Sequence, residues 1–566
     1  MITILNYGTV RAQEALIPEE RRIDWRLSGV PGGIPKREQI FTTLTDLDAS
    51  GSTDVSGEIQ NALRNCPNDQ VVALPAGTYR IDKSISIPHR RILRGIRPGD
   101  VVLKGSAAPL VRFYQYQAWS EPRLLSKSAA KGDNVIELGT LPSDLGPGMQ
   151  VQIQENNEPD VIMSGIESGG GPWAKGQWVT ITSVNADGLC GIIPPLYSDY
   201  RTALNARIRY PFLSESPRQR NFTEYAGLEN VTLLNEGASS SKIVEFGFAA
   251  YCWMKDVRTR NAGVCHVWML DTMRCELRGC TFDGILPPIT SSRGYGIQLG
   301  TPNSGQPSAK TTALLLEDNI FDGNRGQMVL GYGASGCVVG YNHFANARDE
   351  KAAIQKPDIL FHSAFPIMNL IEGNSGTRGV VGDIFHGNAW HNTIFRNWFK
   401  GKEEGKTSAL SSIELDMHHR YYNVLGNVLG YDGIVDDVAK LINPAGFSTY
   451  EDVAPTASPY GNHYKVFMLG YYGEGGGTSS YDVEVSDTLI RHGNYDYVTE
   501  STVWSDSISM RTLPASLYHT SRPEWFADGV PWPCIGPDVD GLTRSNGAKS
   551  RYESQRPTAP SRPVLD

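Results

Sequence analysis

The chain has 566 residues and a formal net charge of −9. This acidic balance argues against a dedicated nucleic-acid binder, which usually carries a basic face. No apolar run approaches the roughly 18 residues that a transmembrane helix needs, so we expect no membrane span. The 59 glycines and 9% aromatic residues, with little helical patterning, favour an all-β protein.

The N-terminal region divides into two stretches. Residues 1–13 have a short apolar start without basic residues, and Val10-Arg-Ala12 resembles the small-x-small end of a signal peptide. This stretch is either a leader remnant or a disordered extension. Residues 14–107 form the next unit, in which the strand-poor part before Gln39 is expected to lie across the first turns of the main body.

A helix and two strands are predicted between residues 46 and 81. A polar loop precedes a short helix near Val55–Arg64, in which Ile59 and Leu63 share one face. Two strands with an intervening turn follow in Val71–Ile81. The loop Asp46-Leu-Asp48-Ala-Ser50-Gly51 resembles the start of a calcium loop, but its twelfth position is Gly57, where a bidentate Glu is needed. We therefore expect no cofactor, with calcium as the one alternative left open.

Residues 108–212 predict a small antiparallel β insertion. Short apolar and polar strands alternate with Gly, Pro and Asn turns, at Lys131–Ile136, Met149–Ile153, Trp178–Ile181 and Gly191–Ile193. The glycine-rich loop 155–178 is expected to be a surface flap, with a groove-covering role as the alternative.

One short sequence motif recurs between Leu316 and Asn427. An apolar residue precedes an asparagine by two or three positions at Asn319, Asn342, Asn374, Asn397 and Asn427, with intervals of 23, 32, 23 and 30 residues. Such a period with Gly and Asn turns is typical of a stacked β solenoid. Equivalent side chains of adjacent coils lie roughly 4.8 Å apart, so the asparagines can hydrogen-bond along the stack and take the left-handed conformation at the corner.

The same register continues on both sides of this stretch. Val231, Val257 and Cys280 take the asparagine position upstream, and Asn494 takes it downstream. Residues 213–500 are therefore predicted to be the solenoid, interrupted by loops. Residues 501–566 are predicted to pack back along it and to end in a Ser-, Pro- and Arg-rich disordered tail.

The N-terminal order of elements resembles a known group of proteins. The polar loop, the helix with Ile59-Gln60-Asn61-Ala62, the stretch Val72–Tyr79 and Leu93-Arg-Gly95 resemble the entry to the pectate-lyase-like superfamily of right-handed parallel β-helices. In that group the helix resembles an N-terminal cap over the open end of the solenoid. Members include pectate lyases, polygalacturonases, related glycosidases and phage tailspikes, so the resemblance implies the fold and leaves the reaction open.

Two cysteines should stack on adjacent coils. Cys252 and Cys275 each precede the repeat position by five residues. Their expected separation suits a disulfide bond in an exported protein, and two buried thiols are the equal alternative.

Counting back from the asparagines aligns polar residues of neighbouring coils. His362, His386 and Asp416 lie 12, 11 and 11 residues before Asn374, Asn397 and Asn427 and are predicted to form a file along the stack. The predicted catalytic residues are Asp383, His386, Glu414 and Asp416, and the predicted substrate-binding residues are His362, His418, His419, Arg420 and, on a more N-terminal coil, Trp268. Trp268 belongs to a weaker second site, His266–Asp271, and a core position is its alternative.

Glycoside cleavage needs one carboxyl group as acid and a second as base or nucleophile, which stacked Asp and Glu residues can supply. A lyase would instead use His386 or His362 as base, with Arg420 or Arg396 at the substrate carboxylate. A metal site from His362, His386 and Asp416 matches no known zinc spacing, so no metal is predicted. Polar ladders without a catalytic role are the remaining alternative.

These observations favour an exported enzyme, secreted or at the cell surface or periplasm, that cleaves a polysaccharide. Hydrolysis is favoured over β-elimination. The alternative is a non-catalytic glycan-binding, surface or fibre-forming protein, and assembly into oligomers is compatible with either. The polygalacturonase Gly-His-Gly motif is matched only in part by Phe385-His386-Gly387, and the paired-aspartate motif of that group is missing.

Overall fold

The computed structural model describes residues 16–114, 118–162, 173–212, 222–237, 242–290, 292–300, 309–439, 451–452, 464–471, 481–526 and 528–555. The predicted leader, residues 556–566 of the predicted C-terminal tail, the core of the glycine-rich loop 155–178 and much of the excursion after Asn427 lie outside these residues. The expectation of disorder was wrong for Gly547–Gln555 of that tail, which are helical.

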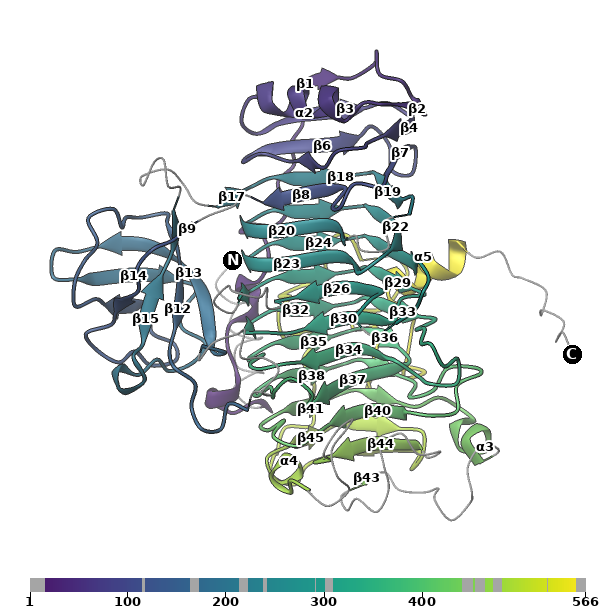
Figure 1. Cartoon of the computed structure of the whole chain (residues 1–566). Helices are drawn as coiled ribbons and strands as arrows, with labels where there is room; N and C mark the ends of the chain where they lie inside the picture. The colour runs from purple at the N-terminus through teal and green to yellow at the C-terminus, as the bar shows by residue number, and fades with distance from the viewer. Residues whose placement is uncertain are drawn as a thin grey trace, which may run out of the picture.

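Three long sheets, which we name A, B and C, make the body of the protein (Figure 1). Successive strands along the chain visit A, B and C in turn, and each strand pairs in parallel with its counterpart on the next coil, as β24 with β28. Crossovers between parallel strands are right-handed. The architecture is therefore a parallel β-helix, as the sequence predicted.

Within the described residues sheet A has 12 strands. In spatial order they are β1 (Ile40–Thr43), β3 (Gln70–Leu74), β6 (Arg91–Gly95), β18 (Gly227–Glu229), β21 (Trp253–Lys255), β24 (Glu276–Arg278), β28 (Leu315–Glu317), β32 (Val338–Gly340), β35 (Leu370–Glu372), β38 (Thr393–Phe395), β41 (Asn423–Leu425) and β45 (Ile490–His492).

Sheet B runs beside sheet A, and its last strand is antiparallel to the rest. Its strands are β2 (Ser50–Asp54), β4 (Gly77–Arg80), β7 (Val101–Gly105), β19 (Thr232–Asn235), β22 (Arg258–Ala262), β25 (Thr281–Ile285), β29 (Ile320–Asp322), β33 (His343–Ala345), β36 (Ser375–Gly376), β39 (Trp398–Phe399), β42 (Val428–Leu429), β46 (Asn494–Asp496) and β47 (Ser501–Val503).

Sheet C carries the longest strands of the body. They are β5 (Ile85–Ser86), β8 (Val111–Tyr114), β20 (Lys242–Ala250), β23 (Cys265–Met273), β26 (Tyr295–Leu299), β30 (Gly326–Leu330), β34 (Pro357–His362), β37 (Arg378–Asp383), β40 (Leu410–Leu415), β44 (Tyr464–Leu469) and β43 (Glu451–Asp452), with β17 (Thr223–Glu224), β27 (Thr311–Thr312) and β31 (Ala334–Ser335) alongside.

The predicted asparagine ladder is present at the corner between sheets A and B. The backbone N–H of Asn319 donates to Oδ1 of Asn342 at 2.9 Å, and Asn342 repeats the contact with Asn374 at 2.9 Å. The chain of bonds continues through Asn397 and Asn427 to Asn494. Every member is buried, so the ladder satisfies backbone groups that water cannot reach. A second ladder, which the sequence analysis missed, joins Asn369 to Asn392.

The left-handed residue at this corner is not the asparagine itself. The positive φ belongs to the preceding residue, as at Asp318 (57°), Tyr341 (54°) and Arg396 (53°), and to glycine at Gly373 and Gly426. The expectation that the asparagine takes this conformation was therefore wrong. The asparagine is selected because its amide bridges coils.

The N-terminal helix and the β insertion are both confirmed. α2 (Ser56–Asn65) buries Ile59 and Leu63 in the core over the first coils. The insertion is an antiparallel sheet of β10 (Arg123–Leu124), β15 (Arg207–Arg209), β12 (Gln150–Gln154), β13 (Gly176–Val184), β14 (Leu189–Ile193) and β11 (Val135–Glu137), with the pair β9 (Ala118–Trp119) and β16 (Pro211–Phe212). It projects from one side of the β-helix (Figure 1).

Segments from both ends of the chain cover the outer face of sheet A. The N-terminal segment carries η1 (Glu19–Arg21) and η2 (Trp25–Leu27), and Trp25 donates to the carbonyl of Met368. It runs along the stack from the late coils, where Arg21 donates to the carbonyl of Thr488, to the first coils, where Arg37 forms an ion pair with Asp69. The predicted position across the first coils therefore holds only for the last part of the segment, and Figure 1 shows its start between the insertion and the β-helix. Its burial of Leu16, Ile17 and Trp25 against sheet A explains this position.

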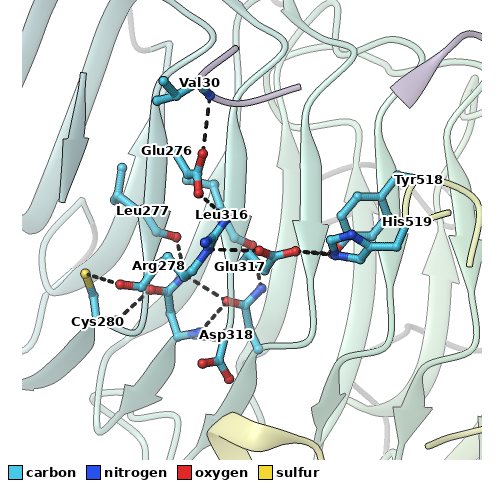
Figure 2. A network of polar contacts seen from close by, with 12 residues as sticks. Val30, Glu276, Leu277, Arg278, Cys280, Leu316, Glu317, Asp318, Tyr518 and His519 are labelled. Carbon is cyan, nitrogen blue, oxygen red and sulfur yellow. Dashed lines mark hydrogen bonds and ion pairs between the residues drawn. The ribbon is translucent and has the colours of Figure 1, made fainter. Parts of the chain in front are cut away.

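The C-terminal segment is fastened to sheet A by buried charges. Glu317 accepts hydrogen bonds from Tyr518 and His519, both at 2.7 Å, and forms an ion pair with Arg278 (Figure 2). Arg396 donates to the carbonyls of Leu513, Pro514 and Ile535 and pairs with Asp538. α5 (Gly547–Gln555) then docks by Arg551 on Asp318.

The remaining helices are short, namely η4 (Thr202–Leu204), α3 (Ile434–Ala439) and α4 (Glu484–Asp487). Among the described residues no helix is long and apolar enough to cross a bilayer. Cys252 and Cys275 are buried free thiols, which decides between the two alternatives for this pair.

Candidate functional site

The outer side of sheet C brings polar residues of three neighbouring coils together. Strand pairing places His362 of β34 opposite Asp383 of β37. The N–H of Asp416, just after β40, donates to the carbonyl of Gly382 at 2.9 Å, so Asp416 is the next member. The file is therefore His362, Asp383 and Asp416. The predicted file with His386 in the middle was wrong, because His386 lies three residues beyond the strand end.

His362 and Asp383 form a close pair. The Nδ1 atom of His362 lies 2.9 and 2.8 Å from the two carboxylate oxygens of Asp383. Burial acts to raise the pKa of Asp383, but the charge and hydrogen bonds of His362 outweigh it and leave the pKa below its ordinary value. Both side chains keep about a fifth of their surface exposed, 23% for His362 and 20% for Asp383. The pair is accessible, and Asp383 is ionised.

Asp416 has the opposite electrostatics. Burial and the negative charges of Glu414 and Asp383 raise its pKa well above the usual range. Only 2% of the residue is exposed, and Oδ1 has no hydrogen-bond partner among the described residues. A carboxyl group in this setting holds its proton at neutral pH.

Glu414 is already occupied by another side chain. It forms a buried ion pair with Arg378 on the neighbouring coil, and Arg378 also donates to the carbonyl of Gln355. The structure thus places Glu414 beside the predicted cluster, where its charge acts on Asp416.

His419 contacts the backbone of Asp383. Its ring is buried, which lowers its pKa to about 4, so it is neutral. Nε2 lies 3.0 Å from the carbonyl of Asp383, which can only accept, so Nε2 carries the proton and Nδ1 accepts from Tyr422. The ring of His419 can take this position because residue 382 is a glycine. A Cβ at Gly382 would lie 2.5 Å from Nδ1 of His419.

His418 and Arg420 lie in a different contact. Arg420 forms ion pairs with Asp482 and Glu484, and the backbone N–H of His418 donates to Asp482. Arg420 is therefore directed to α4 and not to Asp383 or Asp416. Asp482 could not have been found from sequence, because a long interruption separates it from this coil.

The second predicted site does not join this cluster. Trp268 is 7% exposed on β23, and the ammonium group of Lys242 lies over its ring. His266 points into the core, where it contacts Thr259 and Asn324, and burial lowers its pKa to about 4. Asp271 is buried against the insertion, where Gln152 donates to it.

The turn after β37 carries the predicted His386 and, beside it, Phe385 and Asn388, which the sequence analysis did not select as site residues. His386 lies with its ring centroid 4.5 Å from that of His362. Phe385 is exposed next to it, and Asn388 is buried. On the preceding coil Ser363 has a φ of +122°, a conformation that side-chain-bearing residues rarely adopt. Such strain concentrates at functional sites.

Within the described ranges no group of three or more His, Cys, Asp or Glu side chains is arranged to hold a metal ion. In the predicted calcium-like loop, the Asp48 carboxylate accepts from the backbone N–H groups of Ser50, Ser52 and Thr53. These bonds stabilise the turn that leads into β2.

Comparisons with known proteins give similarity to solved structures. The chain resembles the tailspike of Acinetobacter baumannii bacteriophage AP22 in complex with A. baumannii capsular saccharide, with a TM-score of 0.42 and 10% identity, over 68% of this chain and 62% of that one. It resembles the tailspike of Pseudomonas phage LKA1 with a TM-score of 0.40 and 10% identity, over 66% and 68%. An A-module of an Azotobacter vinelandii mannuronan C-5 epimerase follows, with a TM-score of 0.35 and 11% identity, over 69% and 87%.

The chain thus spans less than two thirds of the first of these structures. Its own three stacked parallel sheets decide the class. The fold is a parallel β-helix. No protein-family model and no curated protein matches the sequence.

Two carboxyl groups on adjacent coils of this β-helix have pKa values shifted in opposite directions. Asp383 is ionised and about one fifth exposed, whereas Asp416 is buried and protonated and lies one coil further. Two titratable groups whose environments separate their pKa values are the arrangement that general acid and base roles require.

Proposed function

We propose that this protein is an exported enzyme that hydrolyses a glycan on the outer face of sheet C. The observation that supports it is the pair of carboxyl groups on adjacent coils with oppositely shifted pKa values, Asp383 and Asp416. Asp416 is the general acid. Asp383 is the base or nucleophile, and His362 fixes its orientation.

The proton path follows from these roles. Asp416 gives its proton to the glycosidic oxygen as the bond from that oxygen to the anomeric carbon breaks. Water supplies the oxygen that the anomeric carbon gains, and Asp383 takes up the proton of that water, either directly or after a covalent intermediate. The neutral ring of His419 holds the backbone of Asp383 in place during both steps.

The charges of the cluster favour hydrolysis over β-elimination. Elimination from a uronic acid needs a cation at the substrate carboxylate. The nearby arginines contact protein acids, Arg378 with Glu414 and Arg420 with Asp482 and Glu484. The accessible His362 is the base that elimination would use, so both reactions must be measured.

The test is a digest of a polysaccharide panel that follows new reducing ends and the absorbance of unsaturated sugars. Reducing ends without absorbance are expected from the wild-type chain. Asp383→Asn and Asp416→Asn should each lower the rate by about 100-fold or more. Asp540→Asn, at a fully exposed carboxylate outside the site, is the matched control.

Two other outcomes would reject the hydrolase. Absorbance that depends on His362 would make the protein a lyase. Glycan binding without any cleavage would support the alternative of a non-catalytic glycan-binding protein and reject the enzyme.

A further inference from the structure

Phe385 is an exposed aromatic residue beside the two carboxyl groups. Its surface is 46% exposed, and it lies two residues beyond Asp383. Among the described residues the other large exposed hydrophobic side chains lie elsewhere, at Ile40, Phe41, Ile96, Leu124, Val135, Leu189 and Val483. Phe385 is therefore the apolar surface that a molecule at Asp383 would meet.

The ring is oriented by its neighbours. Its plane is within 8° of that of His362, with ring centroids 6.1 Å apart, and it meets His386 edge-on at 84° and 4.4 Å. Phe385 and His362 thus face the same way, and Asp383 is bonded to His362. A flat ligand on Phe385 would lie next to the imidazole ring that holds the Asp383 carboxylate.

The turn that carries Phe385 is held from three directions. Asn388 accepts from the N–H of Ile162 at 2.9 Å and donates to the carbonyls of Asp160 at 3.0 Å and His418 at 3.2 Å. Gly387 has a φ of +137°, and a Cβ there would lie 2.6 Å from the carbonyl oxygen of Ile162. Two of these anchors, Asp160 and Ile162, belong to the β insertion. An aromatic side chain at a mobile loop tip would need no such anchoring.

We propose that Phe385 is the stacking platform for a pyranose ring and that the insertion sets its position through Asn388. The C–H groups on one face of a pyranose carry partial positive charge and pack on the negative face of an aromatic ring. This inference rests on the proposed function. It specifies the ligand as a sugar that has one accessible apolar face. It also makes the insertion part of the glycan site.

The test measures glycan affinity in the non-cleaving Asp383→Asn background, by mobility in gels containing each polysaccharide of the panel. Phe385→Ala should weaken binding about tenfold. Phe385→Tyr keeps the ring and should retain the affinity, whereas Phe385→Leu keeps the apolar area and should not. Phe41→Ala, at a ring of similar exposure (42%) on β1, is the control and should bind as the parent does.

Asn388 is a positioning residue, which a double-mutant cycle can show. Asn388→Ala should weaken binding in the Asp383→Asn background. It should have no added effect when Phe385 is already alanine. An equal loss in both backgrounds would mean that Asn388 has only a structural role. Melting curves of each variant make sure that all of them are folded at the assay temperature.

The outcomes separate this inference from the proposed function. Unchanged affinity of Phe385→Ala, with cleavage by the wild-type chain, overturns the platform and leaves the hydrolase standing. Binding that depends on Phe385 without cleavage supports the platform and rejects the hydrolase. Absence of both binding and cleavage across the panel rejects both.

Discussion

Asp383 and Asp416 occupy neighbouring positions on adjacent coils, yet their pKa values move in opposite directions. His362 lies opposite Asp383 on the preceding coil and favours its charged form. Asp416 is buried, and this burial together with the like charges of Glu414 and Asp383 favours its neutral form. One position along the stack therefore decides which carboxyl group keeps a proton.

The pH profile of cleavage should report the charge of Glu414. Deprotonation of Asp416 sets the basic limb of kcat/KM, and Glu414 raises the pKa of Asp416. Glu414→Gln removes that charge and should move the basic limb to lower pH by about one unit. The measurement is kcat/KM against pH, with Asp540→Asn as control. A basic limb that stays in place would contradict the assignment of Asp416 as the acid.

The asparagine ladder should contribute strongly to stability. Asn397→Ala removes the acceptor of the Asn374 N–H and the donor to the carbonyl of Ile371, leaving both buried groups unpaired. We expect a loss of about 2 to 4 kcal/mol in the free energy of unfolding. Chemical denaturation measures it, and Asn61→Ala on the exposed face of α2 should change stability by less than about 0.5 kcal/mol. Equal effects of the two substitutions would reject the role of the ladder.

Glu372 should make the attachment of the C-terminal segment sensitive to pH. It is fully buried, accepts from the N–H of Leu517, and burial raises its pKa to about 7. A raised carboxyl pKa means that the folded protein binds the extra proton, so stability falls as pH rises from about 4.5 to 7. Glu372→Gln cannot ionise. Its stability relative to the wild type should therefore increase on going from pH 5 to pH 8, by on the order of 2 kcal/mol. Thermal melts at both pH values measure this, and a constant difference would contradict it.

Gly382 should be intolerant of a side chain. An added Cβ would lie 2.5 Å from the ring of His419, which bonds the backbone of Asp383. Gly382→Ala should destabilise the fold by about 1 to 3 kcal/mol and reduce cleavage, because His419 is displaced. Gly57→Ala in α2 meets nothing within 4 Å and should be neutral or slightly stabilising. Normal activity of Gly382→Ala would show that His419 is not needed for the position of Asp383.

Part of the candidate site could be predicted by counting residues. The intervals before the asparagines placed His362 and Asp416 on the correct face, because each coil repeats the same register. Counting residues selected His386 wrongly, because the turn after β37 is longer than the turns after β34 and β40. Asp383, not His386, takes the position between His362 and Asp416 along the stack. Counting residues also could not predict that Arg420 pairs with Asp482, which lies after the long excursion that follows Asn427.

The sequence by itself determined the β-helix, its cap and its insertion. Periodic signals such as Asn319 to Asn427 arise from contacts between identical positions of neighbouring coils, which lie at a fixed distance in the chain. Only the tertiary structure decided what covers sheet A, which carboxyl group is buried, and that the insertion reaches Asn388. The cover of sheet A and the contact of Asn388 join segments hundreds of residues apart, and the burial of Asp416 depends on packing between neighbouring coils. Burial and charge, rather than any local sequence pattern, select these partners.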